Sequence, residues 1–268
     1  MPGIAKHIDT HLHGERTTRE PRQVEQPTPG ATRRQRFSTW LGTYLGSMVY
    51  GGLDGIITTF AVVSGVAGAD LDSRVILILG IGNLLADGFS MGTGDYLSTK
   101  SEREYYAREA RRQAREIEQS PEAPRARLRA LYLQHGYSEQ EADALVAVQT
   151  RDRQRWVNAL LIEELGLVRQ EVNPLYNALA TFLAFVIAGA VPLLIYLLGL
   201  AIPIAADTAF AWSVALSALA LFGLGAAKVF VTHLNPLRSG LEMLAVGGLA
   251  ATVAYVIGAL LKNIGVAG

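Results

Sequence analysis

The sequence contains no cysteine in its 268 residues. Disulfide bonds, thiolate metal sites and cysteine nucleophiles are therefore excluded. Charge is also scarce outside two blocks, residues 1–36 and 100–173. Long apolar tracts lie between and after these blocks, and 50% of the whole chain is hydrophobic. This blockwise pattern is typical of an integral membrane protein that carries a polar insert.

The apolar tracts are long enough to cross a membrane as helices, because a hydrocarbon core of about 30 Å requires roughly 20 helical residues. The sequence therefore predicts an all-α integral membrane protein with five transmembrane helices and a cytoplasmic helical domain inserted between spans two and three. The expected spans are approximately 40–66, 75–98, 176–199, 208–231 and 240–261. The expected domains are a tail (1–36), spans one and two (37–99), the insert (100–173) and spans three to five (174–268).

The tail has no apolar stretch of the kind a signal peptide needs, and it is rich in charge, Pro, Thr and Gln. We expect it to be disordered. Its histidines, His7, His11 and His13, could hold a metal loosely. A flexible polar tail is the favoured interpretation, because a disordered segment loses conformational entropy when it binds.

Lysines and arginines are concentrated on one side of the expected spans. They occur in the tail, in the insert and at Arg238, whereas the opposite loops hold only Arg74 and Lys262. The positive-inside rule then places the N-terminus and the insert in the cytoplasm and the C-terminus outside. We expect a bacterial inner membrane, and an organellar membrane stays open.

The first expected span carries Asp54 near its middle, within "YGGLDGIITTF". An ionisable residue at membrane depth is costly and usually faces a bundle interior or water, so a functional role is favoured. The alternative is a structural carboxylate that caps a helix broken at the neighbouring glycines. Gly51 and Gly55 also have the GxxxG spacing that allows two helices to approach closely.

The second expected span contains polar residues in its second half. Asn83, Asp87, Met91 and Asp95 are four residues apart and form one stripe along a helix face. A lone methionine in an apolar helix is usually core packing, but Met91 is flanked by carboxylates on its own stripe. Carboxylate oxygens with one thioether suit Fe²⁺ or Mn²⁺ better than Mg²⁺ or Ca²⁺. We interpret the stripe as a cation path.

Several motifs, in the same order, resemble those of the vacuolar iron transporter family, and of its bacterial-type members in particular. They are "GLDGIITTFAVVSGVAGA", "LLADGFSMGTGDYLSTKSEREYYARE", "EELGLV", the following "NP" and "ALATFLAFVIAGAVPLL". The resemblance covers nearly all of residues 37–268. It implies a transporter and not an enzyme, which exports Fe²⁺ and often Mn²⁺ from the cytosol in exchange for protons.

The resemblance also implies a homodimer with the path between subunits and a metal-binding domain after the second span. Asp54, Met91 and Asp95 match the family's transport residues, and Asp87 is acidic in bacterial-type relatives. Since carboxylates bind either a divalent cation or protons, the same groups can couple the two fluxes. We expect transition-metal ions, protons, membrane lipid and a second copy as partners, with no resident cofactor and no nucleic acid.

The insert reads as four helices, the third of them opened by a capping box at Ser138 and Glu141. The resemblance implies metal-binding glutamates on its first and last helices. The matching residues are Glu109 and Glu116, with Glu102 in the same seven-residue repeat, and Glu163 and Glu164.

Arginines depart from the family pattern in the insert, where Arg125, Arg127 and Arg129 stand in place of expected glutamates. The alternative to a metal site is a solvated helix with Glu–Arg pairs four residues apart. Such pairs are Glu104–Arg108 and Arg112–Glu116, and each stabilises a helix by a few tenths of a kcal/mol. Oxygen ligands alone bind Fe²⁺, Mn²⁺ or Zn²⁺ without strong discrimination.

Three other functions compete with a proton-coupled exporter. An intramembrane protease could use paired aspartates, but Met91 would then have no role. A metal sensor or membrane scaffold would bind metal through residues 100–173 without flux and would tolerate loss of Asp54. A passive divalent-cation channel would carry metal whether or not a pH gradient is present. Ligand chemistry does not rank Fe²⁺ against Mn²⁺, Co²⁺ or Zn²⁺.

Overall fold

The structure is a computed structural model that describes residues 33–227 and 235–265. The chain divides into two units, residues 1–41 and 42–268. Residues 1–32 of the expected tail lie outside the described residues, and so do its histidines, His7, His11 and His13. A helix begins at Arg33.

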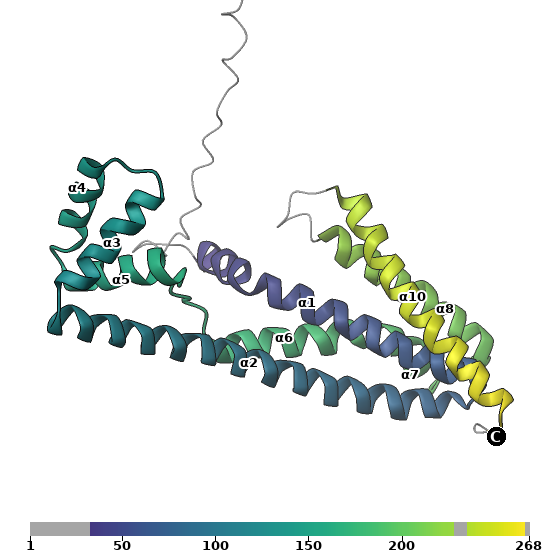
Figure 1. Cartoon of the computed structure of the whole chain (residues 1–268). Helices are drawn as coiled ribbons and strands as arrows, with labels where there is room; N and C mark the ends of the chain where they lie inside the picture. The colour runs from purple at the N-terminus through teal and green to yellow at the C-terminus, as the bar shows by residue number, and fades with distance from the viewer. Residues whose placement is uncertain (1–32, 228–234, 266–268) are drawn as a thin grey trace, which may run out of the picture. The chain divides into compact units, whose positions relative to one another are not determined.

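The regular elements of the described part are all helical (Figure 1). Their order is α1 (Arg33–Gly68), α2 (Ser73–Gln119), α3 (Glu122–Gln134), α4 (Glu139–Gln149), α5 (Arg153–Leu165), α6 (Pro174–Gly189), the 3₁₀ turn η1 (Val191–Leu193), α7 (Leu194–Leu198), α8 (Ala206–Ala227) and α10 (Pro236–Asn263).

Five of the described helical segments are long and apolar enough to cross a membrane, as the sequence predicts. They are Gly42–Gly68, Ser73–Gln119, Pro174–Leu198, Ala206–Ala227 and Pro236–Asn263. Many large apolar side chains on these segments are exposed, such as Ile78, Phe89, Leu219 and Leu249. Exposed apolar surface of this extent matches a hydrocarbon environment, since a protein in water rarely leaves such patches uncovered.

The third span is interrupted at Pro192. α6 ends at Gly189, and a 3₁₀ turn leads into α7. The Ser213 side chain of α8 donates a hydrogen bond of 2.7 Å to the Pro192 carbonyl. A neighbouring helix thus satisfies irregular backbone at membrane depth, which is the condition for tolerating it there.

Glycines bring α1 against α6, as the GxxxG spacing predicts. A Cβ at Gly51 would lie 2.5 Å from the Thr181 carbonyl oxygen, and one at Gly55 would overlap the Phe185 carbonyl oxygen. The absent side chains let the two backbones touch. This contact fixes the segment of α1 that carries Asp54.

α2 is a single helix of 47 residues that joins the second span to the insert. α3 and α5 pack on its second half, and α4 packs on α3 and α5 (Figure 1). The expected capping box of α4 is present, with Ser138 and Glu141 bonding reciprocally. The insert has its own apolar core, formed by Ile117, Leu128, Tyr132, Ala142, Val146, Trp156, Val157, Ala159, Leu160 and Leu161. It is therefore a packed all-α unit rather than a loose linker.

Candidate functional site

The stripe predicted on α2 is present and half-buried along its whole length. Asn83, Asp87, Met91 and Asp95 are all partly exposed. The adjoining face of the helix, by contrast, is buried at Gly80, Leu84, Gly88 and Gly92. That buried face packs on the third span, because a Cβ at Gly88 would meet Phe185 at 3.2 Å and one at Gly92 would meet the Ala178 carbonyl at 3.1 Å. The stripe therefore lies along the edge of this helix contact.

Met91 also contributes to packing. It contacts an apolar cluster that includes Leu84 and Phe185. Its thioether is thus held at the edge of the core, between two turns that carry carboxylates. This placement is compatible with both interpretations of the methionine, core packing and a soft ligand.

Asp54 is half-buried in α1, which continues unbroken from Arg33 to Gly68. The alternative in which Asp54 caps a broken helix is therefore wrong. Its backbone carbonyl accepts a hydrogen bond of 2.8 Å from the Thr58 hydroxyl. Among the residues that the structure describes, none donates a hydrogen bond to the carboxylate of Asp54 or of Asp87. Asp87 is near enough to act on Asp54 electrostatically.

Asp95 differs from these two aspartates because both of its carboxylate oxygens are held by α6. The Asn177 side-chain amide donates to Oδ1 at 2.9 Å, and the Thr181 hydroxyl donates to Oδ2 at 2.5 Å. Asn177 also donates to the Thr99 hydroxyl at 3.2 Å and accepts from the Ser47 hydroxyl at 2.8 Å. One hydrogen-bonded network therefore joins α1, α2 and α6 at the end of the stripe nearest the insert.

Sequence reasoning misses Asn177 and Thr181 of the third span. Their spacing of four residues in an otherwise apolar span is the signal that could have revealed them, because it places both on one helix face. Both side chains are almost fully buried, at 8% and 1% exposed. Buried polar groups need partners, and Asp95 is the partner of both.

In the insert, the predicted glutamates are engaged with cations of the chain itself. Glu116 receives Arg127 in a bidentate pair, at 2.6 Å and 3.0 Å. Glu164 receives the same arginine through Nε at 3.3 Å. Glu109 is almost buried and pairs with Arg112 at 2.7 Å and with Arg108 at 3.3 Å.

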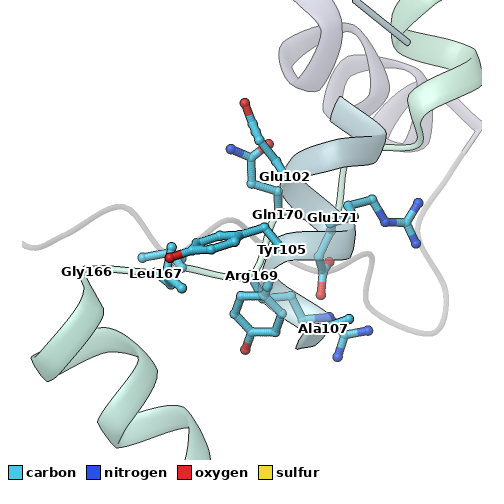
Figure 2. A pocket seen from close by; sticks show the side chains of 11 residues that line it. Glu102, Tyr105, Ala107, Gly166, Leu167, Arg169, Gln170 and Glu171 are labelled. Atoms are coloured by element: carbon cyan, nitrogen blue, oxygen red, sulfur yellow. The ribbon is translucent and has the colours of Figure 1, made fainter. Parts of the chain in front are cut away.

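The remaining two candidates lie apart from this group. Glu163 contacts His135 at 3.3 Å. Glu102 lines a surface cavity of about 710 Å³ between α2 and residues 166–171, together with Tyr105, Leu167 and Arg169 (Figure 2). The structure thus brings only Glu116 and Glu164 of the five predicted glutamates to a shared partner, Arg127.

For two of the expected ion pairs, the structure shows partners that differ from those expected from the sequence. Arg112 pairs with Glu109 rather than with Glu116, which Arg127 occupies. Glu104 pairs with Lys100, at 3.8 Å, rather than with Arg108. Local spacing alone cannot distinguish partners three and four residues away, since both are neighbours on a helix.

No three His, Cys, Asp or Glu side chains come together as a metal-holding group within residues 33–227 and 235–265. This applies to the stripe as well as to the insert. Metal binding by the insert therefore stays a prediction. The stripe offers single carboxylates in succession, an arrangement suited to passage of a cation rather than to its storage.

The fold and this site define a multi-pass membrane protein with acidic side chains at membrane depth. The chain is similar to the VIT family, whose model matches residues 45–259. Because that match covers most of the sequence, the chain belongs to this family, and the resemblance inferred from its motifs is confirmed.

Curated relatives agree with the assignment. A vacuolar iron transporter of Toxoplasma gondii is 36% identical over 225 residues, which are 82% of this chain and 74% of the relative. Vacuolar iron transporter 1 of Arabidopsis thaliana is 34% identical over 83% of this chain and 88% of its own length. A vacuolar iron transporter of Plasmodium falciparum is 32% identical, with 82% of each chain covered. The family is thus one of transporters rather than enzymes.

Proposed function

We propose that this protein is a secondary transporter that exports Fe²⁺, and also Mn²⁺, from the cytoplasm in exchange for protons. The path runs along the stripe of Asn83, Asp87, Met91 and Asp95 on α2 and past Asp54 on α1. The relatives are named as iron transporters, and the chemistry of the stripe extends that activity to Mn²⁺.

The observation that carries the proposal is the state of Asp54 and Asp87. Both are half-buried in membrane-spanning helices, and among the described residues no donor satisfies either carboxylate. A carboxylate without a partner at membrane depth is expensive, so it is retained where a cation or a proton has to bind. One group that accepts either species in turn is sufficient to couple their movements.

A second copy of the chain completes this path in our proposal. The stripe is half-buried within one chain and presents its ligands singly, so facing ligands from a partner subunit would provide the remaining coordination. We place the insert in the cytoplasm and the C-terminus outside, on the distribution of Lys and Arg. The membrane we propose is a bacterial inner membrane.

The test is uptake of Fe²⁺ and Mn²⁺ by proteoliposomes, with and without an imposed pH gradient. We expect metal flux that the gradient drives and that Asp54→Ala and Met91→Ala abolish or strongly reduce. Asp207→Ala and Met243→Ala are the matched controls, because Asp207 is exposed in the first turn of α8 and Met243 lies on α10, away from the stripe. Both controls should transport as the wild type does.

The alternatives predict different outcomes of the same measurement. Flux of equal size with and without the gradient would indicate a passive channel. No flux under any gradient, together with metal binding by residues 100–173, would indicate a sensor or scaffold. Retained flux in Asp54→Ala would contradict the proposed path.

A further inference from the structure

Three helices of the insert converge on one guanidinium group. Arg127 of α3 forms a bidentate pair with Glu116 of α2, at 2.6 Å and 3.0 Å. Its Nε donates to Glu164 of α5 at 3.3 Å. Each of the three side chains is only 26–35% exposed. This pair of carboxylates from two helices thus shares a single partly buried cation.

A buried amide closes the arrangement. Gln113 of α2 is 0% exposed. Its carbonyl oxygen accepts from Arg127 Nη2 at 3.4 Å, and its amide nitrogen donates to Glu164 at 3.4 Å. The guanidinium is therefore surrounded by oxygen atoms from three side chains, and the amide also ties the two acceptor helices to each other.

These oxygens are the ligand type that hard and borderline divalent cations take. They are already arranged around a positive charge that belongs to the chain. Arginine suits the position because its planar fork bonds a carboxylate through two N–H groups and still has N–H groups for further acceptors. The hydrogen bond to Glu116 raises the pKa of Arg127 above its usual value, so the charge is permanent.

We propose that Arg127 is the resident cation of this carboxylate site and takes the place that a divalent metal ion would otherwise fill. The insert then holds α2, α3 and α5 together without bound metal. A divalent ion gains Glu116 and Glu164 as ligands only when the guanidinium is removed. This inference concerns the insert alone, so it stands or falls independently of the transport activity.

The experiment measures thermal unfolding of the full-length protein in detergent, with Mn²⁺ as the metal and EDTA as the chelator. Trp156 is buried in the insert core, so its fluorescence reports on this part of the chain. The chain has three tryptophans, and Trp40→Phe with Trp212→Phe leaves Trp156 as the only one. In this background we expect the same midpoint with EDTA as with Mn²⁺.

Arg127→Met should lower the midpoint in EDTA by roughly 5 °C, since 1 kcal/mol shifts a domain of this size by about that amount. Mn²⁺ should then restore the midpoint toward its original value. Adding Glu116→Gln and Glu164→Gln to Arg127→Met should abolish the rescue. Arg153→Met is the matched control, because Arg153 joins α5 to the single carboxylate of Glu118 and both are more than half exposed. It should show no rescue by Mn²⁺.

Two results would overturn the proposal. The first is an increase in the midpoint of the Arg127-containing protein on addition of Mn²⁺, if this increase disappears in Glu116→Gln. Such a result would mean that metal binds while Arg127 is in place. The second is an Arg127→Met protein that folds but gains nothing from Mn²⁺. Should Arg127→Met fail to fold in EDTA, purification in Mn²⁺ decides the matter, since recovery of folded protein supports the proposal and failure in both conditions contradicts it.

Discussion

The two acidic regions of this protein use the same chemical group in opposite ways. In the membrane-spanning helices, Asp54 and Asp87 have no hydrogen-bond donor among the described residues. In the insert, Glu109 pairs with Arg112, and Glu116 and Glu164 share Arg127. The cost of an unpaired charge is highest at membrane depth and lower near water. The unpaired carboxylates thus lie where an unpaired charge costs the most free energy.

This contrast predicts that the paired carboxylates serve stability and the unpaired carboxylates serve transport. Paired carboxylates contribute to folding, and removing one partner of a partly buried pair leaves the other uncompensated. Unpaired carboxylates cannot stabilise the fold through such pairs. We therefore attribute them to binding of the transported ions. Asp95 lies between the two cases, because α6 holds both of its oxygens with neutral donors. The predictions below test the contrast, from the largest expected effect to the smallest.

Neutralising one acid from each region should give opposite results. Asp87→Asn should reduce proton-driven Mn²⁺ flux in proteoliposomes to the level of empty vesicles, with little change in the thermal midpoint. Glu116→Gln should lower the midpoint reported by Trp156 and leave flux per folded protein unchanged. Loss of flux in Glu116→Gln at full stability would erase the distinction between the regions.

Releasing Asp95 from α6 should give an intermediate effect. Thr181→Val removes the hydroxyl that donates to Oδ2 at 2.5 Å. We expect flux at low metal concentration to fall on the order of tenfold, the size of effect seen when a metal ligand loses its orienting partner. A rise in KM with a nearly constant maximal rate would identify a positioning role.

Two variants control this experiment. Thr181→Ser keeps a donor and should restore the KM. Thr252→Val removes a hydroxyl that donates to the Gly248 carbonyl of its own helix, at 2.7 Å, and should leave flux unchanged. If Thr181→Val transports normally, the network around Asp95 is structural only.

Forcing α1 away from α6 should lower the thermal stability of the protein. A Cβ at Gly55 would overlap the Phe185 carbonyl oxygen, so Gly55→Ala forces the two helices apart. Overpacking of this kind costs about 1–3 kcal/mol. The measurement is the thermal midpoint of the full-length protein in detergent. Gly46→Ala is the control, because a Cβ there meets nothing within 4 Å, and equal midpoints for the two variants would contradict the close contact.

The smallest effect is expected at an exposed pair of the insert. The hydrogen bond from Arg129 holds the pKa of Asp143 below its usual value of about 3.9. A lowered pKa in the folded state adds stability at pH values above the usual pKa, and this is lost as the pH falls through the lowered one. Arg129→Met should therefore lower the Trp156 midpoint slightly at pH 7, and this difference should shrink as the pH falls below the usual pKa of Asp143. A difference that persists in acid would exclude this pair as its source.

The helices and the stripe could be predicted because their signals are local. Apolar runs and the Ser138–Glu141 box each act within a few residues. The four-residue spacing of the stripe needs only helix geometry. The partners of Asp95 and Arg127 could not be predicted, since Asp95 bonds residues 82 and 86 positions away. Such contacts depend on how helices pack, and one sequence does not reveal which faces meet.

The unbroken length of α2 has a mechanical consequence. A helix of 47 residues extends for roughly 70 Å at 1.5 Å per residue, and it carries Asp87 in its first third and Glu116 near its C-terminal end. From Asp95 to Gln119 it contains neither proline nor glycine at which to bend. A tilt of the helix at Asp95 during a transport cycle should therefore swing the insert as a lever arm. A spectroscopic label on the insert would report, in water, a movement that starts inside the lipid.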